Sequence, residues 1–264
     1  MMDIWNTETF DQELIYSLRK NDSLISNYWI EENRRMNAYI ECNRSAPLQS
    51  NNLTTAYNSI VENILRPLVA GTPIRIWHYT RLLDHEANSM SEKIHLSTRE
   101  TLRARLVDLQ SRHIFTQTEV EVLFNQSPFQ TQNDTRSNRL YATTCPYPST
   151  YIRIKSFLKR WGGESAHFHL QDIDLMEKLE NIGLPRIVEI ELLTEGLNAY
   201  RVASSVARVW GRRCGQQTEP INFDYSTKDP DVEMRVIRIH SKGDNLFSKI
   251  GTSYPISCHL LIDD

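Results

Sequence analysis

The sequence lacks an apolar run of the ~18 residues that a membrane-spanning helix needs. Its first residues, Met1 to Asn6, show neither the basic start nor the apolar segment of a secretory signal. Hydrophobic residues make up 40% and charged residues 24% of the 264 positions, as in ordinary globular proteins. We therefore expect a cytoplasmic protein with no membrane partner.

Cysteine is scarce, and its placement argues against both a disulfide framework and a zinc site. The sequence has four cysteines, which lie far apart and form no Cys-x-x-Cys pair: Cys42, Cys145, Cys214 and Cys258. Such spacing is typical of reduced thiols.

The motifs of several common enzyme classes are also missing. The sequence contains neither Gly-x-Gly-x-x-Gly nor a P-loop, so a bound nucleotide is not held by a glycine-rich phosphate loop. The absence of Gly-x-Ser-x-Gly disfavours a serine hydrolase. His167 and His169 would share one face of a predicted strand, but without a third ligand nearby they favour packing or surface roles over a metal site.

The net charge of −3 argues against binding a polyanion over the whole surface. Basic residues nevertheless gather locally, and each cluster fits either a solvated helix face or a patch that contacts phosphates. The clusters are Arg99, Arg103 and Arg105; Lys155, Lys159 and Arg160; and Arg208, Arg212 and Arg213.

The pattern changes near residue 70. Apolar residues recur at helical spacing over about 8–40 and 56–69, with a polar, proline-containing loop at 43–54. Gly71-Thr72-Pro73 then ends the helical pattern. We predict a helical N-terminal extension over residues 1–70 and a second domain over 71–264.

From Ile74 onward, predicted strands and helices alternate unevenly, which favours an α+β fold over a doubly wound parallel sheet. The predicted strands are rich in β-branched or aromatic residues and span 74–78, 94–97, 140–143, 166–170, 186–193, 221–225 and 233–240. The predicted helices span 99–111, 117–124, 151–160, 175–182 and 199–213. Asp172 is the expected N-cap of the fourth helix, and Gly183 its stop.

The first of these strands ends in polar residues. Ile74, Ile76 and His78 alternate on one face of a half-buried strand, and Tyr79 and Thr80 follow. A histidine and a hydroxyl can bond ribose oxygens, and an aromatic ring can stack on a flat heterocycle. His78 equally fits a histidine satisfied by neighbouring backbone and packed under Tyr79.

The next polar segment also has two interpretations. Ser97 and Thr98 either cap the helix that begins at Arg99 or line a ligand site, and both roles can coexist. Ser97 and Glu100 have the Ser-x-x-Glu spacing of a capping box, which supports capping.

Trp77-His78-Tyr79-Thr80, followed by Glu86, Met90, Ile94 and Leu96-Ser97, resembles the opening motif of the ADP-ribosyltransferase superfamily. There, an aromatic-His-x-Thr/Ser strand precedes a short helix and an Ile/Leu-x-Leu-Ser segment. DNA-modifying toxins of that superfamily and RNA 2′-phosphotransferases have similar openings. The second group shows a His-Leu-Ser like His95-Leu96-Ser97.

Over most of residues 74–255 the chain is also similar to an uncharacterised bacterial group. The marks of that group include Trp-His-Tyr-Thr-Arg-Leu, Trp-Gly-Gly-Glu and a late His-x-x-Gly-Asp. They occur here at 77–82, 161–164 and 240–244.

The superfamily resemblance implies a split β-sandwich and NAD as a substrate. In that fold His78 and Thr80 would hold a ribose, and Tyr79 or Tyr141 would stack on nicotinamide. Arg81 would meet the pyrophosphate, and Ser97 would line the pocket. Tyr141 equally fits a tyrosine at a sheet edge.

The resemblance also requires a carboxylate that stabilises positive charge as nicotinamide leaves. Glu219 is favoured because it precedes the last two predicted strands. Asp224 is an alternative with a shorter side chain. Glu164, predicted at a strand start after two glycines, is the third candidate. Its carboxylate could instead act as the base that deprotonates the acceptor. Those glycines equally fit a helix C-cap.

The sequence therefore predicts a NAD-dependent ADP-ribosyltransferase, an intracellular bacterial toxin or phage-defence effector. The favoured acceptor is a nucleic acid, with RNA preferred, and a protein acceptor is the alternative. A toxin implies an antitoxin protein, which the N-terminal helices or residues 254–264 would bind. A non-catalytic binding protein that keeps this fold is the other alternative.

Overall fold

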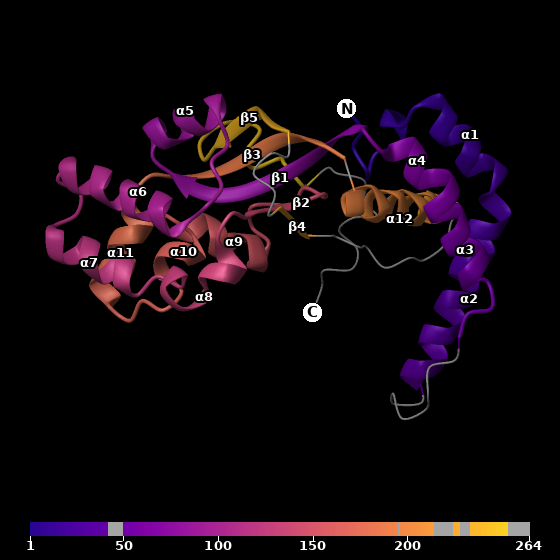
Figure 1. Ribbon diagram of the computed structural model, residues 1–264, viewed down its shortest axis with the longest axis horizontal. Helices are drawn as coiled ribbons and strands as arrows, with labels where there is room; N and C mark the ends of the chain where they lie inside the picture. The colour runs from indigo at the N-terminus through magenta and orange to yellow at the C-terminus, as the bar shows by residue number, and fades with distance from the viewer. Residues whose placement is uncertain (42–49, 195, 214–223, 228–232, 253–264) are drawn as a thin grey trace. The chain divides into compact units, whose positions relative to one another are not determined.

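The computed structural model describes most of the chain, namely residues 1–41, 50–194, 196–213, 224–227 and 233–252 (Figure 1). These residues form two compact units. The first comprises the described residues within 1–75 and 193–223, and the second those within 76–192 and 224–254. This division differs from the predicted one, in which every residue after 70 belonged to the second domain.

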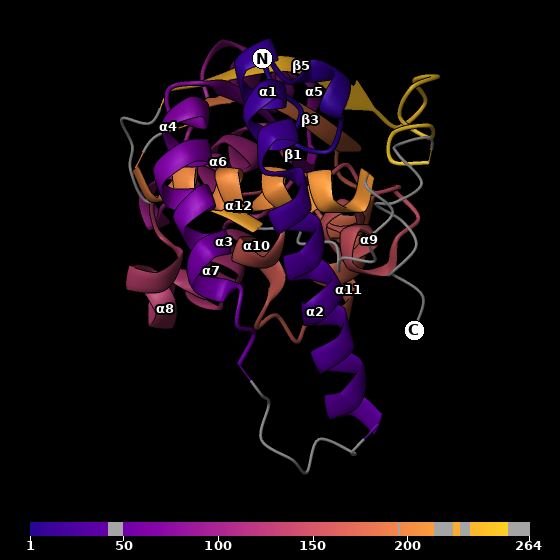
Figure 2. The same ribbon diagram turned by 90° about the vertical axis from the view of Figure 1, so that its right-hand side faces the viewer.

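The first unit is helical. Its elements are η1 (Thr7–Thr9), α1 (Gln12–Lys20), α2 (Asp22–Glu41), α3 (Thr54–Ile60), η2 (Val61–Leu65), α4 (Arg66–Val69) and α12 (Gly196–Arg213). The late helix α12 packs against α2, α4 and η2, and Figure 2 shows it crossing the early helices. Ile25 and Trp29 of α2, and Val202 and Val206 of α12, have i, i+4 spacing and are buried. This spacing places an apolar stripe on each helix.

Proline explains the irregular middle of the second helical segment. Pro67 has no backbone N–H and its ring collides with the preceding turn of a regular α-helix. The five residues before α4 adopt a π-helix, in which the N–H of Arg66 donates to the carbonyl of Val61. The helical pattern predicted over 56–69 is therefore confirmed as three short, continuous pieces.

The described strands form one five-stranded sheet in the order β4-β2-β1-β3-β5. Strand β2 pairs antiparallel with β1 and with β4, and β3 pairs antiparallel with β5. The mixture of helices and sheet confirms the predicted α+β class. The bounds are β1 Pro73–Leu82, β2 Leu140–Thr143, β3 Leu184–Leu193, β4 Asp224–Thr227 and β5 Met234–Ser241.

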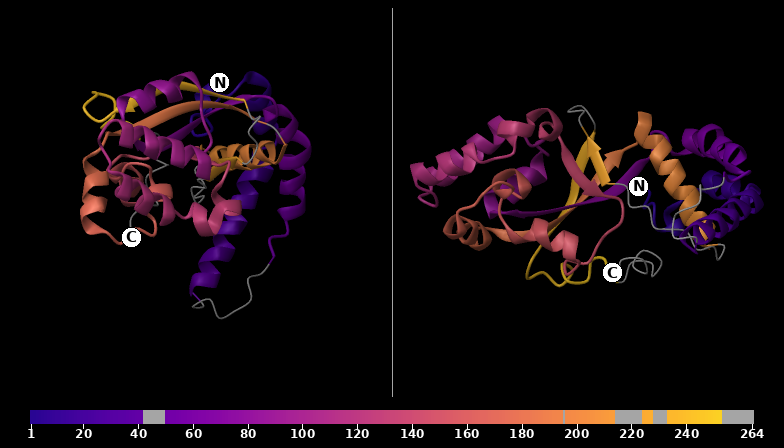
Figure 3. Two further views of the ribbon diagram at one scale, coloured as in Figure 1. Left: turned by 60° about the vertical axis from the view of Figure 1, so that its left-hand side comes forward. Right: turned by 90° about the horizontal axis from the view of Figure 1, so that it is seen from below.

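Helices of the second unit lie around the sheet (Figure 3). They are α5 (Asp84–Glu92), α6 (Arg99–Ser111), α7 (Gln117–Asn125), α8 (Phe129–Arg136), α9 (Ile152–Lys159), α10 (Glu164–His167) and α11 (Ile173–Asn181). One apolar cluster joins residues of α6, α7 and α11 around Trp161. Another joins Trp77, Tyr79 and Ile187 of the sheet to Ile154 and Leu158 of α9.

Two of the predicted strands are wrong. Residues 166–170 lie in helix α10 and the turn after it, because Ala166 and Leu170 are spaced i, i+4 and are both buried in the helical cluster. Residues 94–97 form no strand and contribute one isolated bridge, between Ser97 and Arg139. Of the strand predicted at 221–225, residues 221–223 lie outside the described part of the chain.

Glycine explains two of the boundaries. Gly183, the predicted stop, follows α11 at φ +63°, and a Cβ there would come within 2.6 Å of the Leu82 backbone. Gly162 and Gly163 also have positive φ, but Glu164 begins helix α10 and not the predicted strand. Among the described residues, no helix is long and apolar enough to cross a bilayer.

Candidate functional site

His78 is fixed by its neighbour in the sheet. Its Nδ1 lies 2.7 Å from the carbonyl oxygen of Tyr141 in β2. A carbonyl oxygen only accepts, so Nδ1 carries the hydrogen, and Nε2 of the neutral ring is an acceptor. Burial and the charge of Arg105 lower the pKa of His78 below its ordinary value, although the bond to Tyr141 opposes them. The ring is therefore neutral near pH 7 and offers one lone pair.

Tyr79 lies in the sheet core. It is 6% exposed and belongs to the apolar cluster with Trp77 and Ile187. Its hydroxyl donates to the Tyr147 carbonyl at 3.1 Å and accepts from the Tyr147 N–H at 2.6 Å. Burial raises the pKa of this hydroxyl. The structure thus gives the Tyr79 ring a packing role and leaves little of it for stacking on a ligand.

Thr80 and Arg81 complete the strand end. Strand alternation places Thr80 on the face of His78, and Thr80 is half-buried. Arg81 donates from Nε to the carbonyl of Ile182 at 2.7 Å and from Nη1 to that of Leu158 at 3.5 Å. Arg81 therefore ties β1 to the last turn of α9 and to the residue after α11, and part of its hydrogen-bonding capacity is already used.

Ser97 and Tyr141 come together at the start of β2. The carbonyl of Ser97 accepts the N–H of Asn138 at 2.9 Å, beside its bridge to Arg139. Tyr141 is 49% exposed, and its hydroxyl lies 3.5 Å from the Thr135 carbonyl. His78 and Ser97 therefore both contact the segment 135–141, to which Tyr141 belongs.

Glu164 contacts the same segment. Its Oε2 pairs with Nη1 of Arg136 at 3.0 Å, and Arg136 follows Thr135 directly in the chain. Nε of Arg136 also donates to Gln132 at 2.6 Å, and its guanidinium lies 4.9 Å from the centre of the Phe168 ring. Arg136 thus links Glu164 to the segment that contains Tyr141. Glu164 makes this contact from the start of a helix and not from the predicted strand.

Of the other two candidate acids, Asp224 lies in the sheet. Glu219, the favoured catalytic acid, lies outside the described residues. The backbone of Asp224 begins β4 and pairs with Thr143 of β2. Residues 254–264, considered for antitoxin binding, also lie outside the described part.

Thr98, and not Ser97, caps helix α6. The Thr98 hydroxyl accepts the N–H of Thr101 at 3.1 Å, and the Thr101 hydroxyl accepts the N–H of Thr98 at 2.8 Å. The capping box is therefore shifted by one residue from the predicted Ser97–Glu100 pair. Ser97 is exposed. Its hydroxyl is not needed for this cap.

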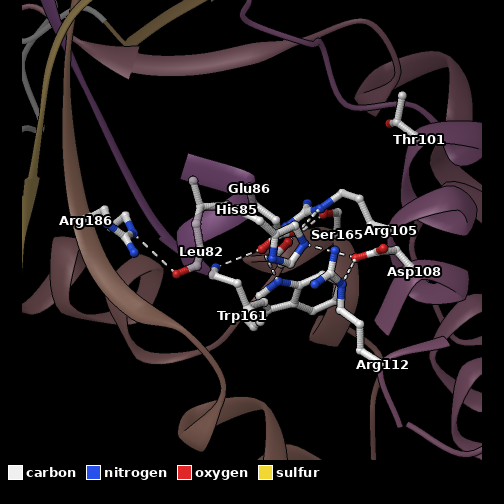
Figure 4. A network of polar contacts seen from close by, with 12 residues as sticks. Leu82, His85, Glu86, Thr101, Arg105, Asp108, Arg112, Trp161, Ser165 and Arg186 are labelled. Atoms are coloured by element: carbon white, nitrogen blue, oxygen red, sulfur yellow. Dashed lines mark hydrogen bonds and ion pairs between the residues drawn. The ribbon is translucent and has the colours of Figure 1, made fainter. Parts of the chain in front are cut away.

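A mostly buried carboxylate, Glu86, organises the network in Figure 4. Its Oε2 accepts from the Trp161 indole at 2.8 Å and from the Leu83 N–H at 2.9 Å. Its Oε1 accepts from Nε of Arg105 at 2.8 Å, and that guanidinium lies 4.5 Å from the centre of the Trp161 ring. Burial raises the pKa of Glu86, but Arg105 and these donors outweigh it and leave the pKa below its ordinary value.

The sequence did not predict that Glu86, Trp161 and Arg105 form one network. Glu86 and Trp161 each occurred in a motif, but 75 positions separate them, and nothing in either motif pointed to the other. Arg105 appeared only as one member of a basic cluster. Its charge connects the network to His78, because Arg105 contributes to the lowered pKa of that histidine.

The late His-x-x-Gly-Asp mark has a structural explanation. Asp244 accepts the N–H of Ser241 at 2.7 Å and closes the turn after β5. His240 lies within β5, and its Nε2 is 3.3 Å from Oε2 of Glu189 in β3, with both residues buried. This pair joins the two strands on the face that carries Ile187, to which His240 is directly opposite.

Ion pairs account for much of the charge in the predicted basic clusters. Arg103 pairs with Glu121, and Arg105 with Glu86. Both Lys159 and Arg160 contact Glu180. Within the described residues, no group of His, Cys, Asp and Glu could hold a metal ion.

Comparison with models of protein families, with curated proteins and with solved structures finds no match to this chain.

Proposed function

We propose that this protein is a NAD-dependent ADP-ribosyltransferase with its NAD site at the ends of β1 and β2. The observation that carries the proposal is the neutral His78 ring, anchored through Nδ1 with Nε2 left as an acceptor. A ribose hydroxyl is a suitable donor to that nitrogen. The proposal includes the split β-sandwich of that superfamily as the finer description of the α+β fold.

We assign three further side chains to the site. Thr80 is on the same strand face, Ser97 is exposed beside the start of β2, and the Tyr141 ring is 49% exposed. We assign stacking on nicotinamide to Tyr141 and hydrogen bonds to the riboses to His78 and Thr80. Tyr79 supports the strand from the opposite face, and the carbonyl bonds of Arg81 make it a positioning residue.

The proposed reaction is a group transfer that balances without an oxidant. The bond between the nicotinamide nitrogen and ribose C1′ breaks, and neutral nicotinamide leaves with the bonding electrons. An acceptor nucleophile forms a bond to C1′ and loses its proton to a nearby base. A carboxylate stabilises the positive charge on the sugar, and we retain Glu219 for this role, with the Glu164 carboxylate as the base that takes the proton of the acceptor.

The cellular role that fits this chemistry is a toxin or phage-defence effector that modifies a nucleic acid, with RNA favoured. A protein acceptor is the alternative. Labelled cell extract digested with nuclease or, separately, with protease separates them, since the label disappears with its carrier. A toxin role also predicts an antitoxin protein as a partner.

The test measures nicotinamide release from NAD by the purified chain. We expect release by the wild type and a loss of about 100-fold or more in His78→Ala, comparable to removing one key polar contact in an active site. Glu219→Gln is expected to behave in the same way. His85→Ala is the matched control, because the His85 ring bonds to Asp108 at 3.0 Å and, among the described residues, to no residue assigned to the NAD site (Figure 4).

Two results would remove the proposal. One is a wild-type chain that neither binds nor cleaves NAD, which would leave a non-catalytic binding protein. The other is equal nicotinamide release by wild type, His78→Ala and Glu219→Gln.

A further inference from the structure

We infer that Phe168 is a stacking platform for a nucleobase of a single-stranded nucleic acid. The side chain follows helix α10 and is 51% exposed, although phenylalanine normally buries most of its surface. His169, also exposed, contacts it edge to face at 4.9 Å. An exposed ring with free surface is the element on which single-stranded bases stack.

Arg136 holds this ring in place. Its guanidinium lies 4.9 Å from the ring centre and is itself held by Gln132 and Glu164. The Arg136 side chain is only 20% exposed. These contacts exist without a ligand. The ring is therefore already held in place, and stacking of a base costs little conformational entropy.

Glu164 adds a hydrogen-bond acceptor beside the ring. It lies four residues before Phe168, and the Phe168 N–H donates to its carbonyl at 3.1 Å, so both side chains emerge from the same side of one helical turn. Oε2 pairs with Arg136, and Oε1 accepts no hydrogen bond from the described residues. A carboxylate oxygen in this position accepts from the exocyclic amine of a base.

Charge favours a base over a phosphate as the group recognised. Arg136, whose guanidinium lies over the ring, is already paired with Glu164. Binding through phosphates needs several unpaired lysines or arginines, whereas a ring binds any base through its π-face. The predicted ligand is therefore an unpaired base and not a duplex backbone.

The platform adjoins the proposed NAD site. Thr135 contacts the Tyr141 hydroxyl, and its neighbour Arg136 contacts Phe168. If the proposed function holds, the stacked base is the acceptor, and Glu164 is placed beside it. This role rests on the proposed function, but stacking itself requires no NAD.

The test is a titration of the full chain, without NAD, into a short single-stranded oligonucleotide that carries 2-aminopurine, whose fluorescence falls on stacking. We expect quenching by the wild type and by Phe168→Tyr, which keeps the ring. Phe168→Ala is expected to weaken binding roughly 5- to 150-fold, the range measured for base–aromatic stacks. Ile173→Ala is the matched control, because Ile173 is an exposed apolar residue of the same unit, at 75%.

Equal binding by wild type and Phe168→Ala, or no quenching by the wild type, would overturn the inference. Nicotinamide release, measured separately, distinguishes it from the proposed function. Quenching without release removes the transferase and keeps the platform. Release without quenching removes the platform and keeps the transferase.

Discussion

Glu86 shows how much a single side chain can organise in this protein. It receives hydrogen bonds from α6, from the start of its own helix and from the segment after α9. Trp161, its indole partner, is fully buried. If a buried indole N–H loses its hydrogen-bond acceptor, it stays shielded from water without a partner. The folded state is then less stable by the desolvation free energy of that group.

Replacing Glu86 by glutamine therefore tests the network. The amide keeps the shape but turns one acceptor oxygen into a donor, which then faces Arg105 or Trp161. We expect the free energy of unfolding to fall by about 1–3 kcal/mol, measured by urea denaturation. Glu121→Gln, which alters the exposed pair with Arg103, is the control and should stay close to wild type. Equal stability of both variants would show that Glu86 is not a structural centre.

For single residues, the sequence predicted the strand face on which a side chain lies better than it predicted what covers that side chain. Alternation correctly placed Ile74 and Ile76 on one face of β1, but Trp77 and Tyr79 on the other face are also buried. A strand covered on both faces has no polar side that alternation could reveal. The packing role of Tyr79 thus depended on α9 and on Phe247, which are distant in the chain.

Helices were predicted most accurately among the elements. The predicted 99–111 matches α6 at both ends, and Asp172 caps α11 as expected, with its carboxylate accepting the Leu175 N–H at 2.9 Å. Helix signals are local, since caps and i, i+4 spacing lie within a few residues. The strand predicted at 166–170 failed because a short apolar run fits either period.

The corrected cap of α6 gives a test at the element scale. Thr98→Ala removes the hydroxyl that accepts the Thr101 N–H and should lower stability by about 0.5–2 kcal/mol. Ser97→Ala should change it little, because the Ser97 contact described here runs through its backbone. Thermal unfolding of both variants followed by circular dichroism measures the difference. A larger loss in Ser97→Ala would favour Ser97 as the cap.

At the scale of the whole molecule, the first unit is built from distant parts of the chain. Helix α12 buries Ala199, Val202, Ala203 and Val206, and it packs on helices from the first 75 residues. The predicted boundary at residue 70 would separate these surfaces. A helix that loses its apolar partners exposes a contiguous patch and promotes association.

We therefore expect residues 71–264 expressed alone to aggregate or to lose cooperative unfolding. Size-exclusion chromatography and a urea titration, with the full chain as the control, measure both properties. A monomeric fragment that unfolds in one transition would show that α12 does not depend on the N-terminal helices.

The sequence by itself determined the features that depend on neighbouring residues: most of the longer helices, most strands, the α+β class and the polar end of β1. Tertiary structure decided which of those residues meet. The tautomer of His78 depends on a carbonyl 63 positions away, and the Glu86–Trp161 bond spans 75. Such contacts arise from chain reversal and strand pairing, and no local pattern records which distant partner the folded chain selects.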